Sequence, residues 1–214
     1  MSETNERRTF KGTVEVRAEG EQSVAVGYAA RFDALSQNLG GFVERIDPKA
    51  FNQTVTQADV RALFNHDANY VLGRSSSGTL RMDVDDEGLR YEIDLPPTAT
   101  GRDLAVLLKR GDISGSSFGF RVLDDEWGET EDGYPLRTLK AVALRDVGPV
   151  TFPAYTAAES ALRSLAEARN LDLDELVSAA KRNELGQVIA PQSEDESSQE
   201  TPTAIIIPRS RGVR

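Results

Sequence analysis

The sequence predicts a mainly β domain with α-helices, an α+β fold, followed by an irregular tail. Short runs of β-branched and apolar residues alternate with turn signals between Phe10 and Pro153. After Pro153 the apolar residues recur at helical spacing instead. From Ala190 the chain is rich in Pro, Ser, Glu and Gln, a composition typical of disorder. We therefore expect a disordered N-terminus at 1–9, a folded domain at 10–158, C-terminal helices at 159–189 and a disordered tail at 190–214.

The strands expected in the folded domain are short and follow one another closely. They cover 13–16, 23–29, 42–46, 60–65, 78–84, 89–95, 113–122 and 138–147. One helix is expected to begin at Asp47 and Pro48, with Asp47 as its N-cap, and another to cover 102–110 with Thr100 as a cap. The acidic segment 124–132 is interpreted as a solvated hairpin tip whose carboxylates could hold Mg²⁺ or Ca²⁺ weakly.

Composition excludes several classes of protein. The 214 residues include 35 Asp and Glu against 25 Lys and Arg, a net charge of −10, which argues against a surface for nucleic acid. No run approaches the roughly 18 apolar residues of a spanning helix, and the N-terminus lacks the apolar run of a secretory signal. Cysteine is absent and His66 is the single histidine, which excludes thiolate nucleophiles, disulfides and multi-histidine metal sites. We expect a soluble intracellular protein without cofactor, metal, membrane or nucleic-acid partner.

Three segments carry residues that can perform chemistry together. They are 63–67 with His66, 111–120 with several serines, and 144–154 with Asp146. Serine hydrolysis needs a hydroxyl activated by a base, and a third group that orients the base. Histidine suits the base role because its ordinary pKa lies near neutral pH. If the chemistry is of this kind, the single histidine must be the base.

Strand periodicity separates the candidate serines. Alternate side chains of a strand face opposite sides, so Ser114 and Ser116 share the face of Phe118 and Phe120, the expected core face. Ser117 lies on the other face between Gly115 and Gly119, which leave room for a peptide to approach. Ser117 is therefore the preferred nucleophile and Ser116 the second choice.

Each of these residues also has an ordinary structural interpretation. A serine between glycines is more often a bulge or turn residue, and a lone histidine after an apolar strand is usually a hydrogen-bonded structural residue. Asp146, beside Arg145, is by default a solvated or salt-bridged carboxylate. None of the three is specific alone.

Taken together, the segments are far more specific. The sequence resembles the prohead serine protease family of tailed bacteriophages, the type found in phage HK97, over about residues 24–158. The motifs that carry the resemblance are Gly27-Tyr28-Ala29-Ala30-Arg31-Phe32, Gly40-Gly41-Phe42, Ala62-Leu63-Phe64-Asn65-His66-Asp67, Val71-Leu72-Gly73-Arg74, the run from Gly111 to Phe120, and Pro149-Val150-Thr151-Phe152-Pro153-Ala154.

The resemblance implies a fold and an activity. Such proteases are similar in fold to the herpesvirus assembly protease, a closed β-barrel surrounded by helices. They act in the host cytoplasm inside the assembling prohead, where they cleave scaffold, or the scaffold-like N-terminal segment of the major capsid protein, and themselves. The resemblance makes residues 10–158 the protease domain and assigns His66 as general base, Ser117 as nucleophile and Asp146 as the residue that orients His66.

The third catalytic position is the least defined by the motifs. Asp67 is the alternative to Asp146, but strand alternation should point it away from His66. The herpesvirus enzymes use a second histidine there, which this chain lacks. The family often has serine where this chain has Gly148, which we interpret as a tolerated change in a loop. Oxyanion donors are expected to be backbone N–H groups.

Two other classes of function remain open. In one, the domain is a catalytically inactive capsid-assembly or scaffolding factor; in the other, it is a small β-rich binding domain with a coincidental likeness. The C-terminal helices and tail are candidate tethers to scaffold or capsid, the tail is a candidate site of self-cleavage, and self-association is possible.

Overall fold

The computed structural model describes residues 4–11, 14–20, 22–32, 34–152 and 157–189. Strands predominate over helices, which confirms the predicted α+β class. The strands are β1 (Glu6–Phe10), β2 (Val14–Glu19), β3 (Gln22–Arg31), β4 (Val43–Ile46), β5 (Arg61–Leu63), β6 (Val71–Arg74), β7 (Leu80–Val84), β8 (Gly88–Asp94), β9 (Gly115–Glu129) and β10 (Pro135–Val150). The helices are α1 (Asn52–Gln57), the short 3₁₀ helix η1 (Ser75–Ser77), α2 (Ala99–Arg110), α3 (Ala157–Arg169), α4 (Leu173–Lys181) and α5 (Leu185–Ile189).

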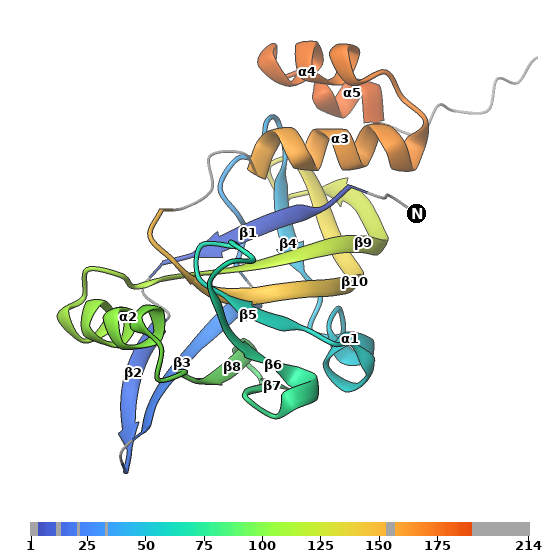
Figure 1. Cartoon of the computed structure of the whole chain (residues 1–214). Helices are drawn as coiled ribbons and strands as arrows, with labels where there is room; N and C mark the ends of the chain where they lie inside the picture. Colours follow the sequence, from blue (N-terminus) through green and yellow to red (C-terminus); the bar gives the residue numbers. More distant parts are fainter. Residues whose placement is uncertain (1–3, 12–13, 21, 33, 153–156, 190–214) are drawn as a thin grey trace, which may run out of the picture.

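The long antiparallel hairpin of β9 and β10 organises the larger of two sheets (Figure 1). The strand order of this six-stranded sheet is β1-β9-β10-β5-β6, and β4 also pairs with β10. Both β4 and β5 run parallel to β10, β4 along its first half and β5 near its end. The second sheet has four antiparallel strands in the order β2-β3-β8-β7.

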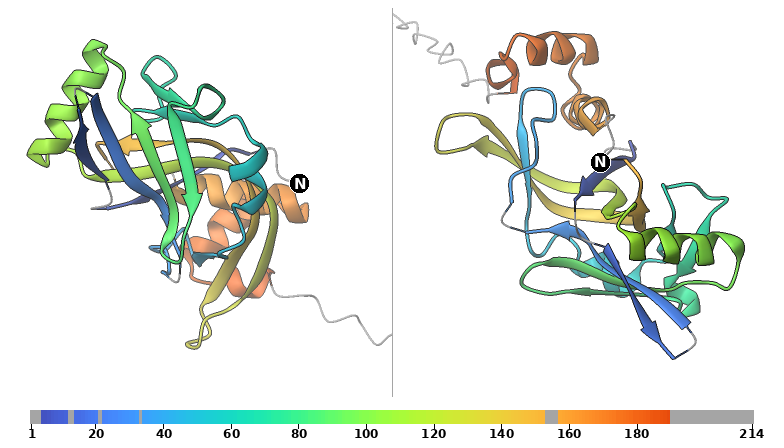
Figure 2. Two further views of the ribbon diagram at one scale, coloured as in Figure 1. Left: turned by 90° about the horizontal axis from the view of Figure 1, so that it is seen from below. Right: turned by 90° about the vertical axis from the view of Figure 1, so that its left-hand side faces the viewer.

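The main hydrophobic core lies between the two sheets. Alternate side chains of β9 (Phe118, Phe120 and Val122) and of β8 (Leu89, Tyr91 and Ile93) are buried in it. Phe118, Phe120 and Val122 therefore form the core face that strand alternation predicts. Ser114, which was expected on the same face, precedes β9 and is exposed. In place of the closed barrel that the resemblance implies, the described strands pair as two sheets that pack together (Figure 2).

The C-terminal helices form a second, smaller core. Apolar side chains of α3, α4 and α5 pack with Leu39, Phe42 and Trp127, the last of which lies on β9. α3 lies along β1, the edge strand of the larger sheet (Figure 1).

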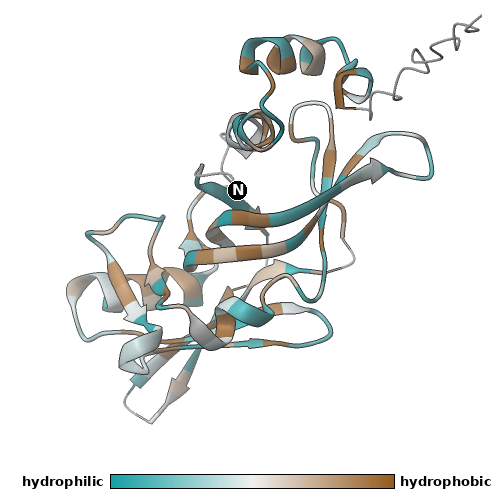
Figure 3. Cartoon of the chain, turned by 90° about the vertical axis from the view of Figure 1, so that its right-hand side faces the viewer, coloured by the Kyte–Doolittle hydropathy of each residue, from teal (hydrophilic) through white to brown (hydrophobic). Residues whose placement is uncertain are grey.

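Coloured by hydropathy, the β9–β10 hairpin is most hydrophilic toward its far end (Figure 3). No helix in the described part of the chain is long and apolar enough to cross a membrane.

Several local expectations need correction. Residues 6–9 belong to β1, so the expected disordered N-terminus is wrong for them. The charged side chains of Glu6 and Arg8, which are typical of an exposed terminus, pair inside the protein. The expected hairpin tip at 124–132 is too long: residues 124–129 still belong to β9, and the turn itself covers 130–134. The tail at 190–214 lies outside the described residues.

The helix starts also differ from the prediction. Asp47 accepts a hydrogen bond from the backbone N–H of Lys49 in a turn, and α1 begins only at Asn52. Thr98, not Thr100, caps α2 by accepting a bond from the N–H of Gly101. In both places the position of the turn or helix start follows from a hydrogen bond between a side chain and the nearby backbone.

Candidate active site

A bulge in β10 brings Asp146 to the side of the sheet on which Ser117 lies. The register with β9 shifts between Leu144, which faces Phe120, and Asp146, which faces Gly119. Without this shift, alternation would give Asp146 the inward orientation of Leu144. Bulges re-aim side chains in this way. The extra residue therefore turns a carboxylate that strict alternation would bury in the core onto the opposite face.

Two glycines supply the space that the site requires. A Cβ on Gly119 would lie 2.5 Å from Oδ2 of Asp146, so the missing side chain accommodates the carboxylate. A Cβ on Gly148 would overlap the carbonyl oxygen of Leu63, because the end of β5, which pairs in parallel with β10 at Val147, comes close to the Gly148 backbone there. Gly148 lies within β10, and the interpretation of this position as a tolerant loop is wrong.

His66 is held over β10 by a tight turn after β5. Asn65 and His66 both have left-handed backbone conformations, with φ of 55° and 58°. Asparagine and histidine adopt this conformation more readily than most residues. The Asn65 side chain accepts from the backbone N–H of Thr151 at 2.8 Å and donates to its hydroxyl at 3.2 Å. These bonds attach the histidine turn to the end of β10.

The three residues proposed from the sequence lie in hydrogen-bond contact. Nδ1 of His66 contacts Oδ1 of Asp146, and Nε2 of His66 lies 2.7 Å from Oγ of Ser117. An ionised carboxylate only accepts hydrogen bonds, so it places the imidazole proton on Nδ1 and leaves the Nε2 lone pair directed at the serine hydroxyl. This is the arrangement that a serine nucleophile and its base require.

The hydroxyl of Ser117 has a second close neighbour in β1. Its Oγ lies 2.8 Å from the backbone carbonyl oxygen of Arg8, and Ser117 is 0% exposed. When Nδ1 carries the imidazole proton, Nε2 of His66 is an acceptor, as is the Arg8 carbonyl. The Ser117 hydroxyl has a single proton and can donate it to only one of them at a time. β1 therefore competes with His66 for the hydroxyl proton and covers the serine.

The other candidates occupy different positions. Ser116 is buried and its hydroxyl donates to that of Tyr91 at 3.0 Å; burial raises the pKa of Tyr91 above its ordinary value. Ser114 is exposed and precedes β9. Asp67 accepts bonds from the backbone and side chain of Asn69, so its carboxylate serves the local turn.

A depression of about 450 Å³ borders the site at Asp146, and its lining also includes Leu63, Val71 and Arg145. Neither His66 nor Ser117 belongs to that lining, so the depression gives no access to the serine hydroxyl. Among the described residues no group of three or more carboxylate or imidazole side chains is arranged to hold a metal ion.

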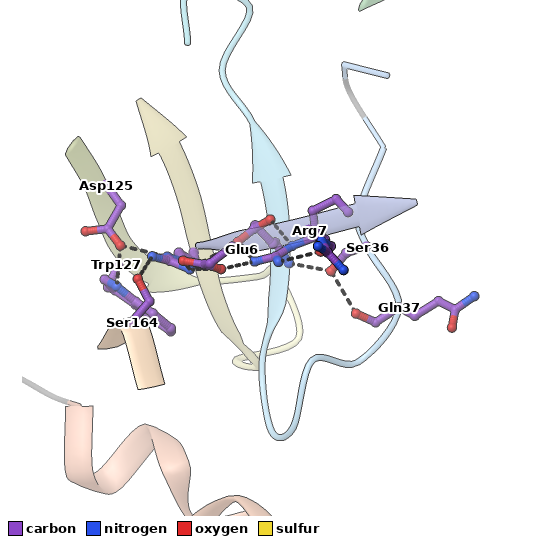
Figure 4. A network of polar contacts seen from close by, with 10 residues as sticks. Glu6, Arg7, Ser36, Gln37, Asp125, Trp127 and Ser164 are labelled. Carbon is purple, nitrogen blue, oxygen red and sulfur yellow. Dashed lines mark hydrogen bonds and ion pairs between the residues drawn. The ribbon is translucent and has the colours of Figure 1, made fainter. Parts of the chain in front are cut away.

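Beside the site lies a buried charged cluster that the sequence does not predict. Its members are Glu6, Arg8, Glu44, Asp125 and Arg137, and its polar contacts continue to Ser164 of α3 (Figure 4). Arg8 donates to both oxygens of Glu44, at 2.7 and 2.8 Å, and Arg137 donates to both oxygens of Glu6 at 3.1 Å. Residues 6–8 are all charged, so their sequence alone does not separate the buried Glu6 and Arg8 from the exposed Arg7.

The electrostatics of this cluster favour the charged forms. Burial alone would raise the pKa of the Glu6 carboxyl, but the charges of Arg8 and Arg137 outweigh burial and hold it below its usual value. Burial would likewise lower the pKa of Arg8, and the carboxylates of Glu44 and Glu6 raise it instead. The cluster is thus a set of mutually compensated ions inside the protein.

Comparison with known proteins identifies relatives of the chain. A family model described as Caudovirus prohead serine protease matches residues 12–171. The chain is 28% identical over 145 residues to the prohead protease of Enterobacteria phage HK97. That alignment covers 66% of this chain and 60% of the relative, so the chain spans less than two-thirds of the relative's length. Among solved structures, the capsid assembly protease of bacteriophage T4 matches with a TM-score of 0.47 at 12% identity, covering 70% of this chain and 98% of that one.

Proposed function

The chain belongs to the caudovirus prohead serine protease family, and on this premise we propose that it is a serine endopeptidase that acts through Ser117, His66 and Asp146. The observation that carries the proposal is the continuous contact from Asp146 through both ring nitrogens of His66 to the Ser117 hydroxyl. A structural role alone would not require the bulge, the two glycines and the left-handed turn that together create this contact.

The proposed reaction proceeds through an acyl-enzyme. Oγ of Ser117 adds to the carbonyl carbon of the scissile peptide while Nε2 of His66 takes the hydroxyl proton. His66 then gives that proton to the departing amine as the C–N bond breaks. A water molecule, deprotonated by His66, hydrolyses the ester and regenerates the serine. Asp146 holds the imidazole in the required tautomer and stabilises its charged form.

We propose that the substrates are phage assembly proteins. The scaffold, or a scaffold-like N-terminal segment of the major capsid protein, is the expected target, together with the protease itself. The site of action is the interior of the assembling prohead in the host cytoplasm. What supports these assignments is membership of the family and the name of the HK97 relative, a prohead protease.

Intact-mass analysis of the cognate capsid protein tests the proposal. The capsid protein is incubated with the wild-type chain, with Ser117→Ala, and with Ser116→Ala as the matched control. We expect cleavage by the wild type and by Ser116→Ala, and a loss of about 10⁶-fold in Ser117→Ala, the scale found for serine nucleophiles. Cleavage by Ser117→Ala at the wild-type rate would refute the assignment of the nucleophile.

A second candidate function follows from the closed state of the serine. Because Ser117 is fully buried under β1, a catalytically inactive capsid-assembly or scaffolding factor is also compatible with the geometry. An inactive factor would co-purify with the capsid protein and leave its mass unchanged, also inside assembled proheads. Cleavage inside proheads that depends on Ser117 would exclude this second function.

A further inference from the structure

β1 occupies the edge of β9 beside the candidate nucleophile. The two strands are antiparallel, with Arg8 opposite Phe118 and Thr9 opposite Ser117. β10 pairs with the other edge of β9, where Gly148 lies opposite Ser117. A peptide that extends the sheet at Ser117 must therefore bind where β1 now lies. β1 also lies before residues 12–171, the range that matches the family model.

The backbone carbonyl of Arg8 lies against the Ser117 hydroxyl, where a substrate backbone has to pass. Oγ of Ser117 lies 2.7 Å from Nε2 of His66 and donates to the Arg8 carbonyl oxygen at 2.8 Å. In a reacting complex the carbonyl carbon must instead lie about 3–3.5 Å from Oγ, with the hydroxyl bonded to its base. The backbone at Arg8 thus occupies the place of a substrate backbone in a non-reacting arrangement and keeps the serine inaccessible to any other peptide.

The rest of the protein offers complementary charges to this strand. Glu44 on β4 and Arg137 on β10 lie opposite each other in the register of that strand pair and are 2% and 0% exposed. Glu44 binds Arg8 with both carboxylate oxygens, and Arg137 binds Glu6. Glu6 and Arg8 are two residues apart and so share one face of β1. Glu44 thus binds a basic side chain and Arg137 an acidic side chain on one extended strand.

We propose that the substrate peptide binds as an edge strand of β9 in the place of β1, and that Glu44 and Arg137 select its sequence. The substrate residue whose carbonyl faces Ser117 is basic and pairs with Glu44. The residue two positions before it is acidic and pairs with Arg137. This inference rests on the proposed function, and it makes the chain's own residues 6–10 the competitor that substrate displaces.

The chemistry of β1 suits exchange. Its buried contacts are largely ionic, since Glu6 and Arg8 face the cluster and Phe10 supplies the apolar contact, stacked on Phe118. If a substrate peptide replaces the charges of Glu6 and Arg8 with one acidic and one basic side chain of its own, Glu44 and Arg137 keep partners of opposite charge. Loss of β1 without a replacement would leave Glu44 and Arg137 without these partners, which disfavours an empty site.

Peptide binding to the full-length Ser117→Ala chain tests the inference without requiring catalysis. The probe is a peptide with the sequence of residues 4–11, and the control peptide has its glutamate and second arginine, the counterparts of Glu6 and Arg8, exchanged. Hydrogen exchange should show that the first peptide exposes the amides of residues 6–10 while β9 stays protected. The exchanged peptide, of equal composition and charge, should bind about 10- to 100-fold more weakly, because two charge-assisted pairs are lost. Equal effects of both peptides, or unchanged protection of β1, would overturn the inference.

Cleavage of capsid protein by the wild-type chain separates this inference from the proposed function. The first peptide should slow cleavage and the exchanged peptide should not. Cleavage that depends on Ser117 but responds to neither peptide would leave the protease intact and overturn the inference. Displacement of β1 without any cleavage, also in assembled proheads, would support the binding surface and refute the protease.

The variant Arg8→Gln gives a second measurement that does not depend on an added peptide. It weakens the pairing of β1 with Glu44 and should therefore increase cleavage of capsid protein several-fold, provided that circular dichroism shows a folded chain. A surface variant of the same strand, Arg7→Gln, is the matched control because Arg7 is exposed. Reduced cleavage in a folded Arg8→Gln chain would mean that β1 is a required part of the site and not a competitor.

Discussion

Two neighbouring groups of polar side chains, the candidate active site and the buried charged cluster, are assembled in opposite ways. The candidate active site depends on backbone geometry: a bulge before Asp146, a left-handed turn at His66, and space at Gly119 and Gly148. The charged cluster around Arg137 instead depends on compensation, since each buried charge contacts an opposite charge. Disturbing the first group should therefore change activity with little effect on stability, whereas disturbing the second should change stability as well.

The largest effect that separates the two groups is expected from Gly119→Ala. The new Cβ would lie 2.5 Å from Oδ2 of Asp146, and the carboxylate, as the end of a side chain, can rotate away. His66 then loses its orienting partner, which costs up to about 10⁴-fold in kcat/KM in enzymes of this kind. The free energy of unfolding should change little.

Gly128→Ala is the matched control for this prediction, because Gly128 is on the same strand and a Cβ there would meet no atom within 4 Å. Activity is measured by cleavage of capsid protein and stability by urea denaturation. A Gly119→Ala chain that cleaves at the wild-type rate would show that the contact with Asp146 does not serve catalysis.

The next effect concerns the cluster. Arg137 is 0% exposed and contacts Glu6, Glu44 and Asp125. Arg137→Met leaves buried carboxylates without their cation, which typically costs about 3–5 kcal/mol of stability. Arg121→Met, on the exposed side of β9, is the control and should cost less than about 0.5 kcal/mol. Denaturation midpoints that shift equally in both variants would contradict the role of charge compensation.

The same contrast explains how far the sequence could predict the molecule. Motif order and strand alternation were enough for the α+β class, for the core face of Phe118 and Phe120, and for the choice of His66, Ser117 and Asp146 as candidates that prove to be in contact. Local residue types predict such features because alternation and turn chemistry act over a few positions.

The remainder depends on contacts between distant segments. Strict alternation cannot foresee the bulge that re-aims Asp146, and the need for glycine at 148 arises from Leu63, far away in the sequence. Glu6 and Arg8 have the composition of an exposed terminus, and only Glu44 and Arg137 make their burial favourable. The pairing of β1 with β9 was therefore not predictable from residues 1–9 alone.

A smaller effect on activity is expected at Asn65. Asn65→Ala removes both hydrogen bonds to Thr151. It also places alanine, which adopts the left-handed conformation less readily than asparagine, at a φ of 55°. The turn that presents His66 loosens, and kcat/KM should fall about 10-fold, the equivalent of one or two hydrogen bonds. Asn65→Gly loses the same bonds but permits the backbone conformation.

Comparing the two Asn65 variants separates the effect of the left-handed backbone conformation from the effect of the hydrogen bonds to Thr151. A smaller loss in Asn65→Gly than in Asn65→Ala would show that the left-handed conformation itself matters. Equal losses would attribute the effect to the bonds with Thr151. Wild-type activity in both would contradict the positioning role.

The smallest effect is a pH dependence confined to the cluster. Burial would raise the pKa of Glu6, but Arg8 and Arg137 outweigh it and lower the pKa below its ordinary value of 4.5. A carboxyl with a lowered pKa in the folded state contributes stability that is complete above its ordinary pKa and is lost as the pH falls through the folded value. Glu6→Gln cannot titrate, so its free energy of unfolding should fall less steeply than that of the wild type as the pH decreases below about 4.5. Because Glu44 and Asp125 are present in both chains, the difference between the two slopes isolates Glu6. Parallel slopes would mean that the charge on Glu6 does not stabilise β1.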